Sequence, residues 1–319
     1  MWGSRLDLGY IVLLLLIGFV AQLVDGSLGM GYGVTSATLL ATIGFAPAVA
    51  SATIHVAKIG TGIMSGTAHW RFGNVNWRAV FMLAIPGTVG AFAGALAISY
   101  IAADVAAPWV SVILAVLGLV VLLRTVFNRK AAIHFHEPRT RLLGPLGLVG
   151  GFIDSVGGGG WGPVTTSTLM AANRMSPNQV IGTVSMSEFI VAIGASVGFL
   201  VALGSESIEW GATALLLIGG LFAAPIAAWL VSRLDHRVLG GLVGGMILVY
   251  NAENVLQLMG IVGPAVLVAQ VAIVGISLAI CAWILRGRRQ ERDDTQRAGL
   301  AGVPEPHLEQ APLELEGTS

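Results

Sequence analysis

Residues 25–40 read DGSLGMGYGVTSATLL, and residues 154–169 read DSVGGGGWGPVTTSTL. The two stretches align without a gap, and the similarity continues into the residues that follow each of them. The aligned pairs are Asp25 with Asp154, Gly31 with Gly160, Tyr32 with Trp161, Gly33 with Gly162, Lys58 with Glu188, and Trp77 with Trp210. Such a duplication in a very apolar chain is typical of secondary transporters, whose substrate site lies where two repeats meet near the bilayer midplane.

The composition argues against a soluble globular protein. Hydrophobic residues make up 55% of the chain and charged residues only 11%, with a mean hydropathy of +0.83. Soluble domains carry roughly 25% charged residues, so we expect a polytopic protein surrounded by the lipid bilayer. The net charge of zero gives no indication of nucleic-acid binding. The single cysteine, Cys281, has no partner for an intramolecular disulfide.

The apolar segments repeat in the same order in both halves of the chain. A helix needs about 20 apolar residues to cross the hydrocarbon core, and each glycine stretch sits between two shorter apolar segments. We therefore predict an all-α polytopic membrane protein with two inverted repeats, each a glycine-broken helical hairpin plus three transmembrane helices, and one extra C-terminal transmembrane helix. The predicted spans are 47–69, 77–101, 105–127, 177–203, 209–231, 237–259 and the unpaired 263–286.

Lys and Arg residues predict the orientation, because cytoplasmic loops hold an excess of them. With Arg129 and Lys130 inside the cell, span 47–69 runs inward and its counterpart 177–203 runs outward, so the repeats are antiparallel. The same assignment places the C-terminus in the cytoplasm and the N-terminus outside, in a cell (inner) membrane. The first apolar segment resembles a signal peptide, but no small-x-small cleavage site precedes Asp25, so we keep it in the mature fold.

These segments divide the chain into five parts. The last part is poor in large apolar residues and contains several prolines, so we expect it to be a disordered tail without a core. The parts are the first membrane repeat (1–127), a cytoplasmic linker (128–141), the second membrane repeat (142–259), the extra transmembrane helix (260–286) and the cytoplasmic tail (287–319).

The glycine stretches predict an anion site. Broken backbone at membrane depth persists only where it is buried in protein or lines a cavity, and each break leads into a segment rich in hydroxyl groups. Free N–H groups at the start of a helix favour anions. A purely structural role, in which the glycines only permit tight helix crossing, stays open. The candidate ligands are Gly31, Tyr32, Gly33, Thr35, Gly160, Trp161, Gly162, Thr165 and Thr166.

Ionisable residues inside a membrane span are functional candidates. Lys58 lies in the middle of span 47–69 with His55 one turn earlier, and Glu188 holds the corresponding place in the second repeat. Lys58 either attracts an anionic substrate while Glu188 or His55 carries protons, or it forms a fixed ion pair with Glu188. Asp25 and Asp154 precede the breaks, and we expect them to be structural caps for the turns that follow.

Other chemistries find no support in the sequence. Gly31-Tyr32-Gly33 is not a potassium filter, since the second copy has Trp161 and a filter needs a fourfold ring of carbonyls. The histidines are dispersed and no GxxxxGK loop is present. We therefore expect no enzyme activity, no catalytic residue, no metal and no cofactor.

At the two glycine motifs, and in NRMSPNQVIGT (173–183), the chain resembles the sulfite exporter TauE/SafE family over roughly residues 10–286. The resemblance implies a secondary carrier of sulfite, sulfonates or related organosulfur anions that works by alternating access, one half rocking against the other. The first repeat departs from the glycine-rich pattern at Ser27, Leu28 and Met30. The alternatives are a passive anion channel and a non-transporting membrane assembly or sensory subunit, and a homo-oligomer is compatible with all of them.

Overall fold

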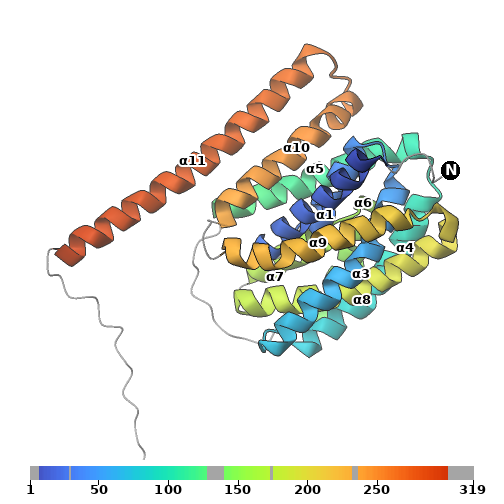
Figure 1. Ribbon diagram of the computed structural model, residues 1–319, viewed down its shortest axis with the longest axis horizontal. Helices are drawn as coiled ribbons and strands as arrows, with labels where there is room; N and C mark the ends of the chain where they lie inside the picture. The colour runs from blue at the N-terminus through green and yellow to red at the C-terminus, as the bar shows by residue number, and fades with distance from the viewer. Residues whose placement is uncertain (1–6, 29, 128–139, 173–174, 232–235, 301–319) are drawn as a thin grey trace, which may run out of the picture.

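The computed structural model describes residues 7–28, 30–127, 140–172, 175–231 and 236–300, and these residues contain helices but no strand (Figure 1). The α-helices are α1 (Leu8–Leu28), α2 (Tyr32–Thr42), α3 (Pro47–Arg71), α4 (Trp77–Ser99), α5 (Ala103–Phe127), α6 (Thr140–Gly157), α7 (Ser167–Ala172), α8 (Pro177–Leu203), α9 (Trp210–Val231), α10 (His236–Leu258) and α11 (Pro264–Leu300). A π-helical turn, η1 (Gly162–Thr166), precedes α7, and a 3₁₀ turn, η2 (Ser205–Ser207), precedes α9.

Local sequence signals explain where the long helices begin. α3 and α8 each start with a proline, which lacks the N–H that the first turn leaves unbonded. Before α8, Ser176 and Gln179 form a reciprocal capping box, and before α4 the side chain of Asn76 accepts the N–H of Ala79. The predicted starts at 47, 77 and 177 therefore coincide with those of the structure.

Five helices in the described part of the chain are long and apolar enough to cross a membrane: Leu8–Gly26, Trp77–Ser99, Ala103–Arg124, Asn178–Leu203 and Pro264–Gly287. The predicted spans 47–69, 209–231 and 237–259 also form helices, although they are not among these five. α3 is less hydrophobic than these five because it carries a row of polar side chains that face the protein interior, Lys58 and His55 among them. The all-helical, multi-pass character predicted from the sequence is confirmed.

The first helix of each repeat packs against a helix of the other repeat. α1 of the first repeat packs along α9 of the second, and their counterparts α6 and α4 pack in the same way. A Cβ at Gly18 in α1 would overlap the carbonyl of Leu216 in α9, and one at Gly147 in α6 would overlap the carbonyl of Leu83 in α4. Because these two contacts join equivalent positions of the duplicated sequence, the two halves are built alike.

Two further large contacts also join the repeats. α3 packs on its counterpart α8, and α5 packs on its counterpart α10. The duplicated helices therefore form one interlocked bundle rather than two separate domains (Figure 1). Their inverted orientation across the membrane stays a prediction.

The two glycine breaks touch each other inside this bundle. The backbone φ is 119° at Gly31 and 76° at Gly158, left-handed values that favour glycine. A Cβ at Gly33 would overlap the carbonyl of Gly158, and one at Gly159 would overlap the N–H of Val34. The close approach of backbones that glycine permits is therefore present at the breaks, whatever further role they have.

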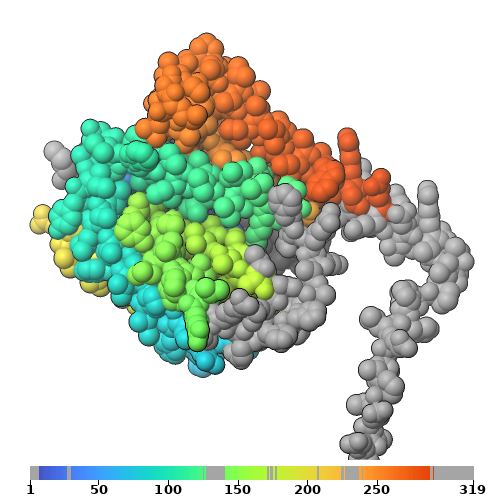
Figure 2. Space-filling view, turned by 180° about the vertical axis from the view of Figure 1, so that it is seen from behind, coloured from blue at the N-terminus to red at the C-terminus, as the bar shows by residue number. Residues whose placement is uncertain are grey.

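The last helix differs from its prediction. α11 projects from one edge of the bundle, where it packs on α10 (Figures 1 and 2). It continues to Leu300, so the predicted disorder of the tail is wrong for residues 287–300. Arg, Gln, Glu and Ala, which are good helix formers, dominate this segment, and the first proline after it is Pro304. Residues 301–319 and most of the predicted linker, 128–139, lie outside the described residues.

Candidate functional site

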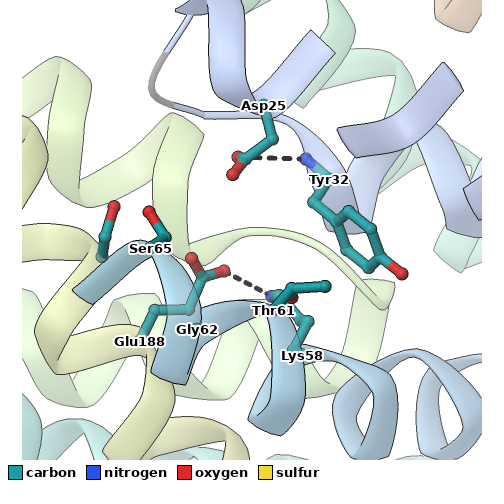
Figure 3. A pocket seen from close by; sticks show the side chains of 8 residues that line it. Asp25, Tyr32, Lys58, Thr61, Gly62, Ser65 and Glu188 are labelled. Carbon is teal, nitrogen blue, oxygen red and sulfur yellow. Dashed lines mark hydrogen bonds and ion pairs between the residues drawn. The ribbon is translucent and has the colours of Figure 1, made fainter. Parts of the chain in front are cut away.

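A pocket lies between four helices, close to the two glycine breaks (Figure 3). α1 and α2 supply one wall, with Asp25 just before the first break and Tyr32 just after it. α3 and α8 supply the facing wall, which carries the charged pair Lys58 and Glu188. The complete lining is Asp25, Tyr32, Lys58, Thr61, Gly62, Ser65, Ser185 and Glu188.

Four of the lining residues come from a single face of α3. Lys58, Thr61, Gly62 and Ser65 follow one another at helical spacing, so their side chains share this face. Gly62 also brings the backbones close, since a Cβ there would lie 3.2 Å from Cα of Phe189 in α8. Only Lys58 was predicted on this face, although the hydroxyl groups at the third and seventh positions after it share its helical spacing.

Lys58 is the centre of a buried ion-pair cluster. Its side chain is 3% exposed, and its Nζ lies 2.7 Å from Oε1 of Glu188 and 3.0 Å from both carboxylate oxygens of Asp154. The ion pair with Glu188 that the sequence left open is therefore present. The second partner, Asp154, was predicted only as a cap, because nothing in the sequence places the residue before the second break beside α3.

Asp154 is bonded on both carboxylate oxygens. Oδ1 accepts the backbone N–H groups of Gly160 at 2.7 Å and Trp161 at 2.9 Å, which is the predicted capping geometry. Oδ2 lies 3.0 Å from Nε2 of His55, and the residue is fully buried. A buried charge is tolerated when it is paired and hydrogen-bonded in this way. Asp154 therefore fixes the second break to α3.

His55 is sealed behind the pocket rather than lining it. Its Nδ1 lies 2.8 Å from the carbonyl of Ser51, whose own hydroxyl donates to the carbonyl of Ser155 at 2.5 Å. Its Nε2 meets the carboxylate of Asp154. Both ring nitrogens therefore have partners inside the protein, and the imidazole is fixed between α3 and α6.

Asp25 has much weaker partners than its counterpart. Its Oδ1 accepts the backbone N–H of Tyr32 at the long distance of 3.4 Å, a marginal form of the predicted cap. Within the described residues no lysine, arginine or histidine lies within ion-pair distance of it. Figure 3 shows its carboxyl group turned toward the space that Glu188 also faces.

Tyr32 carries a second underused polar group. The residue is 2% exposed, and its hydroxyl has no hydrogen-bond partner in the described part of the chain. A buried polar group without a partner is rare in native structures and needs an explanation. Figure 3 shows this hydroxyl pointing away from Asp25 and Glu188, so it lies behind the wall that Tyr32 forms.

The other predicted ligands are buried around the breaks and do not line the pocket. The N–H groups of Gly160 and Trp161 already donate to Asp154, and the indole N–H of Trp161 donates to the carbonyl of Val184 at 3.2 Å. The hydroxyl of Thr165 donates to the carbonyl of Trp161, whereas that of Thr35 has no partner. The residues that the structure separates from the pocket are Gly31, Gly33, Thr35, Gly160, Trp161, Gly162, Thr165 and Thr166.

The donor set of the site does not suit a bound transition metal. Within the described residues, no group of three or more His, Cys, Asp and Glu side chains could hold a metal ion. What the pocket offers is a buried lysine, two carboxyl groups and several hydroxyl groups, a set that binds small ions and protons.

Comparison with known proteins agrees with this picture. The family model described as sulfite exporter TauE/SafE matches residues 14–253. The probable membrane transporter protein YtnM of Bacillus subtilis (strain 168) is 48% identical over 243 residues, which cover 76% of this chain and 81% of the relative. No solved structure matches the chain. The matched family segment contains both glycine breaks and every residue that lines the pocket, and the chain belongs to the sulfite exporter TauE/SafE family of membrane proteins.

Proposed function

We propose that this membrane transporter is a secondary carrier of a small sulfur-containing anion, such as sulfite or a sulfonate, with Lys58 as the group that binds the anion. The observation that supports this most directly is the place of Lys58, which is the single cation among the residues that line the pocket. The family description and the name of the Bacillus subtilis relative supply the membrane-transport context.

The ion pairs of Lys58 suggest how an anion enters. Asp154 is held by two backbone N–H groups and by His55, so it stays with Lys58. Glu188 is 18% exposed, and among the described residues its carboxylate has Lys58 as its ion-pair partner. In our proposal the anion replaces Glu188 beside the ammonium group, while Thr61, Ser65 and Ser185 offer hydroxyl groups to its oxygens.

Alternating access, with one half rocking against the other, completes the proposal. A passive channel would use the same pocket but would not bind and release its substrate in a closed cycle. The two mechanisms differ in counterflow, because only a carrier accumulates labelled anion against unlabelled anion of the same kind.

The test is anion flux in proteoliposomes that contain the purified full-length chain. We expect saturable uptake of labelled sulfite or methanesulfonate, accumulation in counterflow, and a loss of about 10- to 100-fold in Lys58→Gln, which removes a charge-assisted hydrogen bond. Arg78→Gln, at an exposed position of α4, is the matched control and should behave as the wild type. Flux without saturation or counterflow would favour the channel, and no flux of either anion would contradict the proposal.

A further inference from the structure

Each repeat places an aspartate opposite an ionisable residue of the other repeat, but the two ionisable residues have opposite charge. Asp154 of the second repeat meets Lys58 of the first, with Nζ 3.0 Å from its carboxylate. Lys58 is aligned with Glu188, and Asp154 with Asp25. The equivalent pair on the other side of this symmetry is Asp25 and Glu188. Both residues line the pocket, which therefore contains two acids at the place where the first pair has an acid and a base (Figure 3).

The charges around this acid pair do not cancel. From α3, Lys58 contributes one cation and His55 at most one more, whereas α1, α6 and α8 contribute the three carboxyl groups of Asp25, Asp154 and Glu188. α2 adds the neutral phenol of Tyr32. With all three acids ionised the cluster would hold at least one excess negative charge, which is costly inside a membrane. A proton shared by Asp25 and Glu188 lowers that charge and removes the repulsion between the two carboxylates.

Tyr32 lines the pocket beside the acid pair. Its hydroxyl is buried and has no partner among the described residues, and Figure 3 shows it pointing away from the carboxyl groups of Asp25 and Glu188. The proposed proton site is therefore confined to the two carboxyl groups.

We infer that Asp25 and Glu188 form a shared proton site, and that a further proton enters this site whenever a monovalent anion binds Lys58. This inference rests on the anion-carrier function proposed above. A proton on Glu188 releases Lys58, and the charge of the incoming anion is balanced by the added proton. The loaded pocket then has the same charge as the empty one, so anion and proton move in the same direction without net charge transfer.

The proton can be counted directly by isothermal titration calorimetry of the purified full-length chain. Methanesulfonate is a suitable probe because it stays a monoanion near neutral pH, so any proton taken up belongs to the protein. Titrations in two buffers that differ in ionisation enthalpy should give about one proton taken up for each anion bound. Binding without proton uptake would overturn the inference and leave the proposed function intact. If neither methanesulfonate nor sulfite binds, both are overturned.

A double substitution assigns the proton to the pair. Asp25→Asn combined with Glu188→Gln keeps the size of both side chains but removes both acids, so anion binding should proceed with no linked proton and no dependence on pH. Glu253→Gln, at an exposed position of α10, is the control and should keep the wild-type proton count. A wild-type count in the double variant would place the proton outside this pair and would overturn the inference.

An infrared measurement keeps the inference testable if the double variant fails to fold. The difference spectrum of the wild type with and without methanesulfonate should show the carbonyl band of a protonated carboxylic acid growing as the anion binds. The absence of this band at saturating anion would overturn the inference.

Discussion

Asp154 and Asp25 stand at the same position of the two repeats, yet their surroundings are opposite. Asp154 is fully buried and bonded to Lys58, His55 and two backbone N–H groups. Asp25 has one long hydrogen bond and faces the pocket. Two differences in the duplicated sequence contribute to the contrast, Lys58 against Glu188 and His55 against Ser185. In a duplicated protein, one copy of a motif can thus be used to hold helices together, while the other copy keeps hydrogen-bonding groups that are available to a ligand.

The largest expected effect is the difference between Asp154→Asn and Asp25→Asn in stability. Asp154→Asn removes the carboxylate that Lys58, His55 and two backbone N–H groups share, and breaking a buried pair in this way costs about 3–5 kcal/mol. Asp25→Asn keeps an oxygen for the N–H of Tyr32 and should stay within about 1 kcal/mol of the wild type. Free energies of unfolding in mixed detergent micelles measure both. Equal losses in the two variants would refute the contrast.

The glycine contacts should instead respond alike in both halves. Gly18→Ala and Gly147→Ala each push a methyl group into the backbone of a helix from the other repeat, and overpacking of this kind costs about 1–3 kcal/mol. We expect similar losses of unfolding free energy in the same micelles. Gly275→Ala in α11, where a Cβ would meet nothing within 4 Å, is the control and should not lose stability. A large loss in one variant alone would show that the halves are not equivalent in packing.

A smaller effect is expected when Glu188 gives up its charge alone. Glu188→Gln frees Lys58 from a carboxylate that lies 2.7 Å away. Because the anion no longer competes with this carboxylate for Lys58, the variant should bind methanesulfonate about 10-fold more tightly, which corresponds to about 1.4 kcal/mol. Calorimetric titration at two pH values checks this. Weaker binding at every pH would mean that Glu188 itself holds the anion.

The smallest effect concerns the aromatic residues of the two breaks. Tyr32→Phe removes a hydroxyl that has no partner, so the unfolding free energy should change by less than about 0.5 kcal/mol. Trp161→Phe loses the bond to the carbonyl of Val184 and leaves a void, and should cost about 2 kcal/mol or more. A stability loss in Tyr32→Phe as large as that in Trp161→Phe would remove the asymmetry between the two breaks.

The sequence predicts the helices better than the site. Pro47 and Pro177 mark helix starts because proline restricts the backbone locally, and the length of an apolar run reflects the thickness of the membrane. The approach of the two breaks followed from the duplication itself. These features depend on neighbouring residues or on the internal duplication, and both can be recognised in a single sequence.

What the sequence could not predict depends on tertiary contacts. Asp154 contacts His55 and Lys58 only because α6 ends beside α3. The sequence of neither segment predicts how these two helices are aligned. Local bonds take up other candidates: the predicted cap on Asp154 uses the N–H groups of Gly160 and Trp161 that we expected to bind an anion, and the hydroxyl of Thr165 donates to the carbonyl of Trp161. The sequence predicted the cap but not that it would leave these N–H groups unavailable to a ligand.

The exchange of helices between the repeats also has a consequence for biosynthesis. The glycine faces of α1 and α4 are covered by α9 and α6, which belong to the second half of the chain. When the ribosome has made only the first half, Gly18 and Gly90 still lack the helices that cover them. Insertion into the bilayer can thus proceed span by span, while tertiary assembly of the earliest helix waits until α9 has been synthesised.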